Sequence, residues 1–83
     1  MGLRGDCELS FDLPRAGVVS LDVFDLAGRR LRTLERGGWR PAGAYRSVWD
    51  GRGDDGLRLR SGVYFVRLSA GPEKRVERVV YLR

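Results

Sequence analysis

Hydrophobic and polar residues alternate with a period of two over most of this chain. The alternation predicts β-strands at 8–13, 19–23, 29–36, 44–49, 57–60, 62–70 and 75–83, of which 57–60 is a short edge strand. No segment repeats apolar residues at the positions i, i+3, i+4 and i+7, so essentially no helix is expected. Six or seven short strands, spaced about ten residues apart, predict an all-β, antiparallel β-sandwich.

Turn residues separate these strands. The segment Asp25-Leu26-Ala27-Gly28 has Asp at its first position and Gly at its fourth, which is the pattern of a hairpin turn. Gly71-Pro72-Glu73 predicts a second hairpin turn. Residues 37–43 are predicted to form a loop because glycine and proline cluster there. The irregular spacing of apolar residues in 29–36 predicts a bulge or strand end near Thr33.

The length of 83 residues suits a single domain, which we place at residues 8–83, with 1–7 as a disordered or linker segment. Cys7 is the single cysteine, so packing alone must hold the fold. No apolar run reaches the roughly 18–20 residues of a membrane span, and we expect no membrane insertion. We also expect no signal peptide, so export would depend on a signal carried by a longer parent chain.

The net charge of +5 comes almost wholly from arginine, and the isoelectric point is about 10.3. Such a charge raises the possibility of binding nucleic acid or an anionic surface. Dispersed arginines favour the plainer interpretation, in which they line the solvent faces of strands. Nucleic-acid binding remains a lesser alternative, and residues 45–49 (Tyr-Arg-Ser-Val-Trp) are the nearest approach to aromatics interleaved with arginine.

Catalytic chemistry is not expected from these residues. The chain has no histidine, so it lacks the commonest general base and the commonest neutral metal ligand. Cys7 therefore has no histidine to activate it, and one cysteine without histidine excludes a zinc site. We expect a protein that is not an enzyme and that has no cofactor and no small-molecule substrate.

The segment 49–56 carries three acids, Asp50, Asp54 and Asp55, in a glycine-rich loop. Their oxygens suit calcium, but the spacing lacks the alternating acids and distal glutamate of an EF-hand. Capping of turns is the favoured interpretation, with weak calcium binding as the alternative. Arg52-Gly53-Asp54 matches the integrin-type tripeptide, which arises easily by chance in a chain rich in these residues.

The two tryptophans, Trp39 and Trp49, could either bind a ligand or belong to the core. Exposed tryptophans can stack against sugars or bases. Aromatic residues at these places more often cap the ends of a sandwich core, and we favour that role for both.

Three blocks, in order across nearly all of residues 8–83, resemble a known family. Residues 19–34 resemble the block V-x-L-x-V-Y-D-x-x-G-R-x-V-x-T-L in the immunoglobulin-like domain of the flagellar hook-capping protein FlgD. Residues 42–43, 48–51 and 56 resemble A-G…W-D-G-x-x-x-x-G, and 61–68 resemble S-G-x-Y-x-x-R-L. The resemblance implies a single immunoglobulin-like β-sandwich with these signature residues: Asp25, Gly28, Arg29, Trp49, Asp50, Gly51, Gly56, Gly62 and Tyr64.

The same blocks occur in C-terminal domains of many secreted bacterial proteins, including sorting domains of the type IX secretion pathway. Phe11, Leu13 and Pro14 and the final segment 79–83 are similar to those sorting domains. The resemblance implies a non-catalytic C-terminal module of a longer secreted or cell-surface protein, acting in sorting or surface attachment. The alternative is a structural or assembly module, as in hook capping.

Recognition by secretion or assembly proteins is expected at the last strand, which a partner could extend by strand addition. The residues expected to carry this recognition are Val79, Val80, Tyr81, Leu82 and Arg83.

Overall fold

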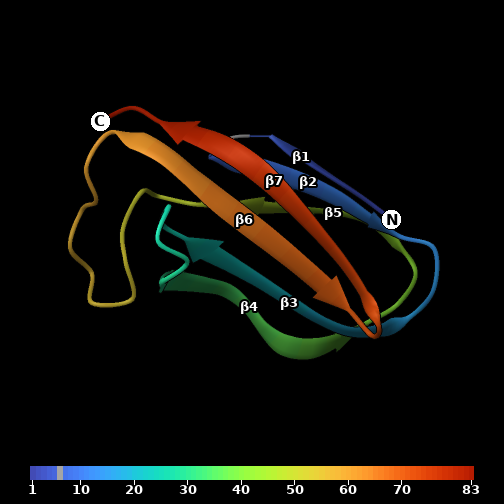
Figure 1. Cartoon of the computed structure of the whole chain (residues 1–83). Helices are drawn as coiled ribbons and strands as arrows, with labels where there is room; N and C mark the ends of the chain where they lie inside the picture. Colours follow the sequence, from blue (N-terminus) through green and yellow to red (C-terminus); the bar gives the residue numbers. More distant parts are fainter. Residues whose placement is uncertain (6) are drawn as a thin grey trace.

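Two antiparallel sheets lie face to face in the computed structural model, which describes residues 1–5 and 7–83 (Figure 1). The strands of the described chain are β1 (Gly2–Gly5), β2 (Glu8–Leu13), β3 (Gly17–Phe24), β4 (Arg30–Arg40), β5 (Gly43–Val48), β6 (Gly62–Ala70) and β7 (Glu73–Tyr81). One sheet has the order β1-β2-β5 and the other β4-β3-β6-β7. The described residues contain no helix, and the predicted all-β sandwich is confirmed.

Alternate side chains of both sheets point inward and form one core. In β2, for example, Leu9, Phe11 and Leu13 are buried while Glu8 and Asp12 are exposed. The rest of the buried core consists of Val19, Leu21, Val23, Trp49, Tyr64, Val66, Leu68, Val79 and Tyr81. Burial of each aliphatic side chain contributes about 1.5–3 kcal/mol to the stability of the fold. A shift of one residue would expose these side chains, so their burial fixes the register of the strands.

The strand β4 is longer than the sequence predicts. We expected residues 37–43 to be a loop, but Gly37–Arg40 belongs to β4, where Gly38 pairs with Val19 and Trp39 pairs with Val18. Register shifts interrupt the pairing of β3 with β4, one of them beside Thr33, which confirms the predicted bulge. Gly37 takes a φ of 70° within another bulge, and this backbone freedom lets the strand continue.

The N-terminal segment also differs from the expectation. We expected 1–7 to be a linker or disordered, whereas β1 pairs with β2, with Leu3 opposite Phe11. Leu3 packs against the core from this strand. The strand is short and glycine-rich, so it lacks an alternation that could reveal it, and β2 supplies the backbone partners that form it. Asp6 lies outside the described residues.

The predicted edge strand at 57–60 is wrong. This segment forms only an isolated bridge between Arg52 and Arg58. The Leu59 amide donates to the Gly51 carbonyl at 2.8 Å, and Leu59 packs against the core. The segment is therefore the return arm of the loop that follows β5. Its Leu57 and Leu59 bond to other residues of that loop, and its Arg60 carbonyl accepts a hydrogen bond from the Tyr64 hydroxyl of β6. No helix of the described residues is long and apolar enough to cross a membrane.

Candidate functional site

The hairpin between β3 and β4 is organised by Asp25. Its Oδ1 accepts hydrogen bonds from the amides of Ala27 and Arg29, both at 2.9 Å, and its Oδ2 accepts one from Arg29 Nε at 2.8 Å. The Arg29 amide, together with the Arg29 side chain, lowers the pKa of Asp25. Gly28 closes the turn with a φ of 83°, and its amide donates to the Asp25 carbonyl. Asp25, Gly28 and Arg29, three of the signature residues, therefore form a turn whose hydrogen bonds are made within the turn itself.

Trp49 caps the core at the end of β5, as the sequence predicts. Its side chain is 1% exposed, and its Nε1 donates to the Arg52 carbonyl at 3.0 Å. The indole packs edge-on against Tyr64 and lies tilted against Tyr81, with ring centroids 5.4 and 5.2 Å away. The same prediction is wrong for Trp39, which is 67% exposed. Trp39 lies beside the exposed Val18, on the face of its sheet that points away from the core.

The carboxylate of each acid in the 49–56 loop accepts a hydrogen bond from another residue of the chain. Asp50 Oδ1 accepts hydrogen bonds from the Arg52 amide and from the side chain of Arg32. Asp54 Oδ1 accepts one from the Thr33 amide at 3.1 Å, which fastens the loop to β4. Asp55 Oδ1 accepts one from the Leu57 amide at 2.9 Å. These bonds agree with turn capping, and no group of three or more candidate metal ligands occurs among the described residues.

The glycines of this loop allow close packing. A Cβ on Gly51 would lie 2.2 Å from the Tyr81 ring, and the φ of Gly51 is 79°. Gly53, in the middle of the Arg-Gly-Asp triplet, is buried, and Arg52 Nη1 donates to the Gly56 carbonyl. Because its arginine and its aspartate are both bonded within the fold, the triplet is a structural part of the loop.

The residues expected to recognise a partner divide between the two faces of β7. Val79 and Tyr81 are buried in the core at 1% and 6% exposure, whereas Val80 and Leu82 are 45% and 77% exposed. Arg83 continues past the strand, and its amide donates to Ser61 Oγ. Residues 79–83 therefore do not form one surface, because successive residues of a strand point to opposite faces.

An exposed apolar row nevertheless remains on the outer side of β7. It consists of Val76 and Val80 of β7 and of Leu82, which directly follows the strand, and the exposed Arg78 lies between the two valines on the same face. We refer to Val76, Val80 and Leu82 as the β7 surface. β7 is the last strand in the order β4-β3-β6-β7, as Figure 1 shows, and β1 of the other sheet contacts it without entering its ladder. The sequence predicts which residues of β7 share a face, but the face that meets the core depends on the opposite sheet.

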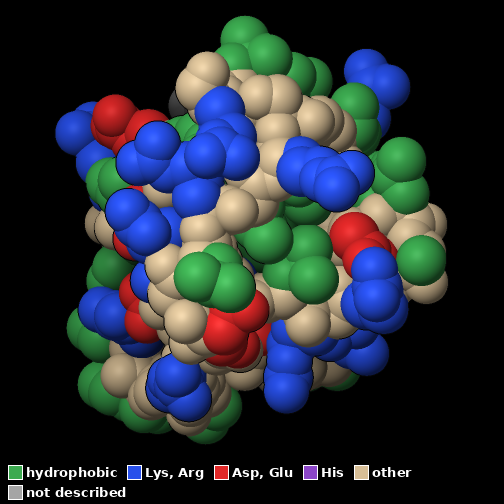
Figure 2. Space-filling view, turned by 90° about the vertical axis from the view of Figure 1, so that its left-hand side faces the viewer, with side chains coloured by type: hydrophobic (Ala, Val, Ile, Leu, Met, Phe, Trp, Pro, Cys, Tyr) green, Lys and Arg blue, Asp and Glu red, His purple; other side chains and the backbone are tan. Residues whose placement is uncertain are grey.

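Basic side chains are spread over the end of the sandwich seen in Figure 2, with acidic and hydrophobic side chains among them. Ion pairs join Arg29 to Asp25, Arg32 to Asp50, Arg40 to Glu35 and Arg46 to Glu8. Exposed pairs of this kind contribute only about 0–1 kcal/mol each to stability. Each pair places a negative charge beside an arginine, so these arginines do not form one continuous positive patch.

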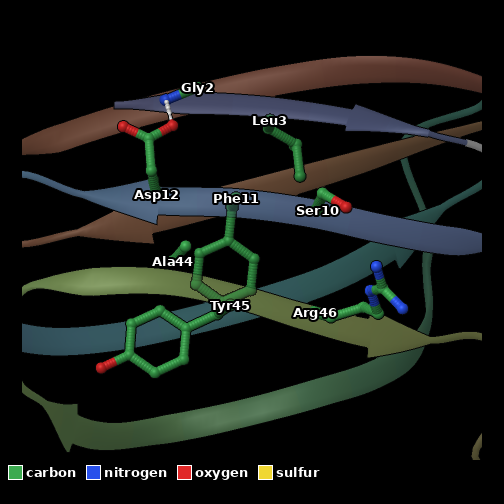
Figure 3. A pocket seen from close by; sticks show the side chains of 8 residues that line it. All are labelled: Gly2, Leu3, Ser10, Phe11, Asp12, Ala44, Tyr45 and Arg46. Carbon is green, nitrogen blue, oxygen red and sulfur yellow. Dashed lines mark hydrogen bonds between the residues drawn. The ribbon is translucent and has the colours of Figure 1, made fainter.

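A shallow hollow lies where β1, β2 and β5 run side by side, as the close view in Figure 3 shows. Small residues, among them Gly2, Ser10 and Ala44, line it. The Asp12 carboxylate beside them accepts a hydrogen bond from the Gly2 amide at 3.0 Å (Figure 3). The Tyr45 hydroxyl donates to the Pro41 carbonyl and Arg46 pairs with Glu8, so these polar groups of the hollow also bond to the chain. The hollow follows from the small side chains of neighbouring strands.

Comparison with known protein families gives a match. The sequence matches the family described as FlgD Ig-like domain over residues 3–73, which is most of the chain. The chain belongs to the FlgD Ig-like domain family. No curated protein matches it. The match of this FlgD Ig-like domain includes all of β2 to β6 and reaches the first residue of β7, so the β7 surface lies beyond the matched residues.

Proposed function

We propose that this FlgD Ig-like domain is a non-catalytic structural module that assembles with other polypeptides through the β7 surface. The observation that carries the proposal is the exposure of Val76, Val80 and Leu82, at 60%, 45% and 77%. None of the three belongs to the buried core, and Val80 and Leu82, which alternate on the same face, form an exposed apolar pair of the kind that protein contact sites use. The module works as part of a longer secreted or cell-surface protein.

Strand addition at β7 is the physical mechanism we propose. A strand at the end of a sheet can pair along its outer edge with an extended segment of another chain, here along the part of β7 that β1 does not contact. Apolar side chains on the same strand then supply contact area, while the backbone bonds supply direction. Membership in the FlgD Ig-like domain family supports a structural module, and the contact at β7 is argued from the exposed side chains alone, because the family match ends at residue 73.

Exchange of exposed side chains tests the assembly role without disturbing the core. We expect Val80→Thr with Leu82→Gln to reduce self-association or co-sedimentation with filament proteins such as those of the flagellar hook. The control is Val48→Thr with Leu57→Gln, since both residues are exposed, at 67% and 68%, and lie outside β7. Equal co-sedimentation of both double variants and the unaltered protein would contradict the proposal.

Sorting through the type IX secretion pathway is the second candidate function, and the position of the exposed pair Val80 and Leu82 near the end of β7 favours it. In this case a reporter fused ahead of the domain should lose export with Val80→Thr and Leu82→Gln. Deletion of 79–83 is a poor test, because it also removes the buried Val79 and Tyr81. Normal export of the double variant would exclude sorting and leave the assembly role untouched.

A further inference from the structure

An apolar groove lies on the outer face of the four-stranded sheet, at the end nearest the β3–β4 turn. Phe24 and Leu26 line it on the β3 side, Val76 lines it on β7, and Phe65 and Arg67 of β6 lie between them. Leu26 and Val76 are 70% and 60% exposed, and none of the five belongs to the buried core. The groove therefore presents hydrophobic area that the fold does not use. We refer to these five residues as the Arg67 groove.

Arg67 brings a positive charge into this apolar setting. Its guanidinium carbon lies 4.7 Å from the centre of the Phe24 ring, which fixes the orientation of the planar group. Its Nε is buried and has no hydrogen-bond partner among the described residues. The buried Nε is out of reach of a ligand, so a bound carboxylate would form its charge-assisted hydrogen bonds with the two outer nitrogens of the guanidinium.

The acids nearest the groove are already engaged. Asp22 pairs with Arg67 across the β3–β6 ladder and is 5% exposed, but its Oδ1 accepts a hydrogen bond from Thr33 Oγ1 on the other neighbouring strand. Asp25 is bound by the Arg29 side chain and by the amides of its own turn. Asp25 also lines the groove, but no ion pair joins Arg67 to either carboxylate among the described residues, so a carboxylate of another chain can still pair with Arg67.

Further positive charge lies beside the groove on β7. Arg78 pairs with Phe65 and Lys74 pairs with Ser69, and both cationic side chains are exposed on the same outer face. A ligand with negative charge is therefore attracted to this part of the sheet, and one with positive charge is repelled.

We propose that the Arg67 groove binds an extended acidic segment of a partner polypeptide. A carboxylate of the segment pairs with the Arg67 guanidinium, and an apolar side chain two positions away lies on Phe24 and Phe65. This spacing follows because residues i and i+2 of an extended chain share one face. The inference rests on the proposed function only in that the ligand is a polypeptide.

Titration with defined peptides tests the groove. The probe is the capped peptide V-T-E-T-V-T-E, and its neutral control is V-T-Q-T-V-T-Q, in which the glutamates are glutamines. Nuclear magnetic resonance reports the Arg67 Nε–H signal directly, and we expect the acidic peptide to shift it while the neutral peptide does not. The affinity should also fall as salt is added, because the added ions screen the charge pair.

Substitutions of single arginines show which of them binds the acidic peptide. Arg67→Gln should weaken binding of the acidic peptide about tenfold to one hundredfold, the range of a charge-assisted hydrogen bond. Arg78→Gln should weaken it less, and Arg15→Gln, in the exposed turn between β2 and β3, should leave it unchanged. Melting curves of each variant verify that the fold is retained.

Three results would overturn the proposal: no binding of the acidic peptide, equal binding of the neutral peptide, or unchanged affinity in Arg67→Gln. Val76 belongs to both the groove and the β7 surface, but Val80 and Leu82 do not line the groove, so substitution of these two residues tests the β7 surface separately. If Val80→Thr with Leu82→Gln abolishes assembly while Arg67→Gln binds the peptide normally, the β7 proposal stands and the groove proposal fails.

Discussion

Trp49 and Trp39 are the same residue in opposite environments, and substitution of each tests the assignment of the core. Trp49 is 1% exposed and hydrogen-bonded, while Trp39 is 67% exposed. Trp49→Ala should lower the free energy of unfolding by about 3–5 kcal/mol, because it leaves a cavity between the sheets. Trp39→Ala should change it by no more than about 0.5 kcal/mol. Urea denaturation measures both, and equal losses would contradict the structure.

Gly51 and Gly28 separate backbone strain from crowding. Both have positive φ, but a Cβ at Gly51 would meet the Tyr81 ring, whereas one at Gly28 meets nothing within 4 Å. Gly28→Ala should cost about 1–2 kcal/mol through the left-handed backbone alone. Gly51→Ala should cost about 1–3 kcal/mol more because the core is overpacked. Thermal unfolding of the two variants provides the comparison, and a smaller loss for Gly51→Ala would refute the contact with Tyr81.

The β3–β4 turn is the element whose stability should depend most clearly on pH. The bonds from Arg29 lower the pKa of Asp25 below its ordinary value of 3.8 in the folded protein. The charged carboxylate therefore stabilises the fold above that ordinary value, and this contribution is lost as the pH falls through the lowered pKa. Asp25→Asn should reduce the melting temperature at neutral pH, and the difference should shrink in acid. A difference that is constant with pH would contradict this role.

Alternation predicts some elements well and leaves others out, for identifiable reasons. The segments 8–13 and 62–70 match β2 and β6 residue for residue, because one face of each strand is buried and keeps a strict period. The predicted strand 29–36 is shorter than β4, because Gly37 and Gly38 suggest a loop by composition. In the structure these two glycines form part of a bulged ladder. The strand β1 depends on backbone pairing with β2, which no local pattern of side chains reveals.

The sequence predicts the β-sandwich, but it does not predict which residues come together on the surface of the molecule. The loop 49–56 suggests a binding site by its acids, yet its carboxylates bond to backbone amides of the loop and of β4. The Arg67 groove has no sequence motif, since it arises where residues of three strands meet on one face. Such juxtapositions depend on the strand order, which the alternation of residues does not specify.

Site-specific photocrosslinking of the chain shows whether the β7 surface contacts another polypeptide. A photoreactive residue replaces Leu82 in one variant and Leu57 in another, since both side chains are exposed, at 77% and 68%. If the β7 surface binds a partner, position 82 gives a discrete crosslinked adduct with another polypeptide and position 57 gives none. Absence of an adduct at position 82, or the same adduct from both positions, would contradict it.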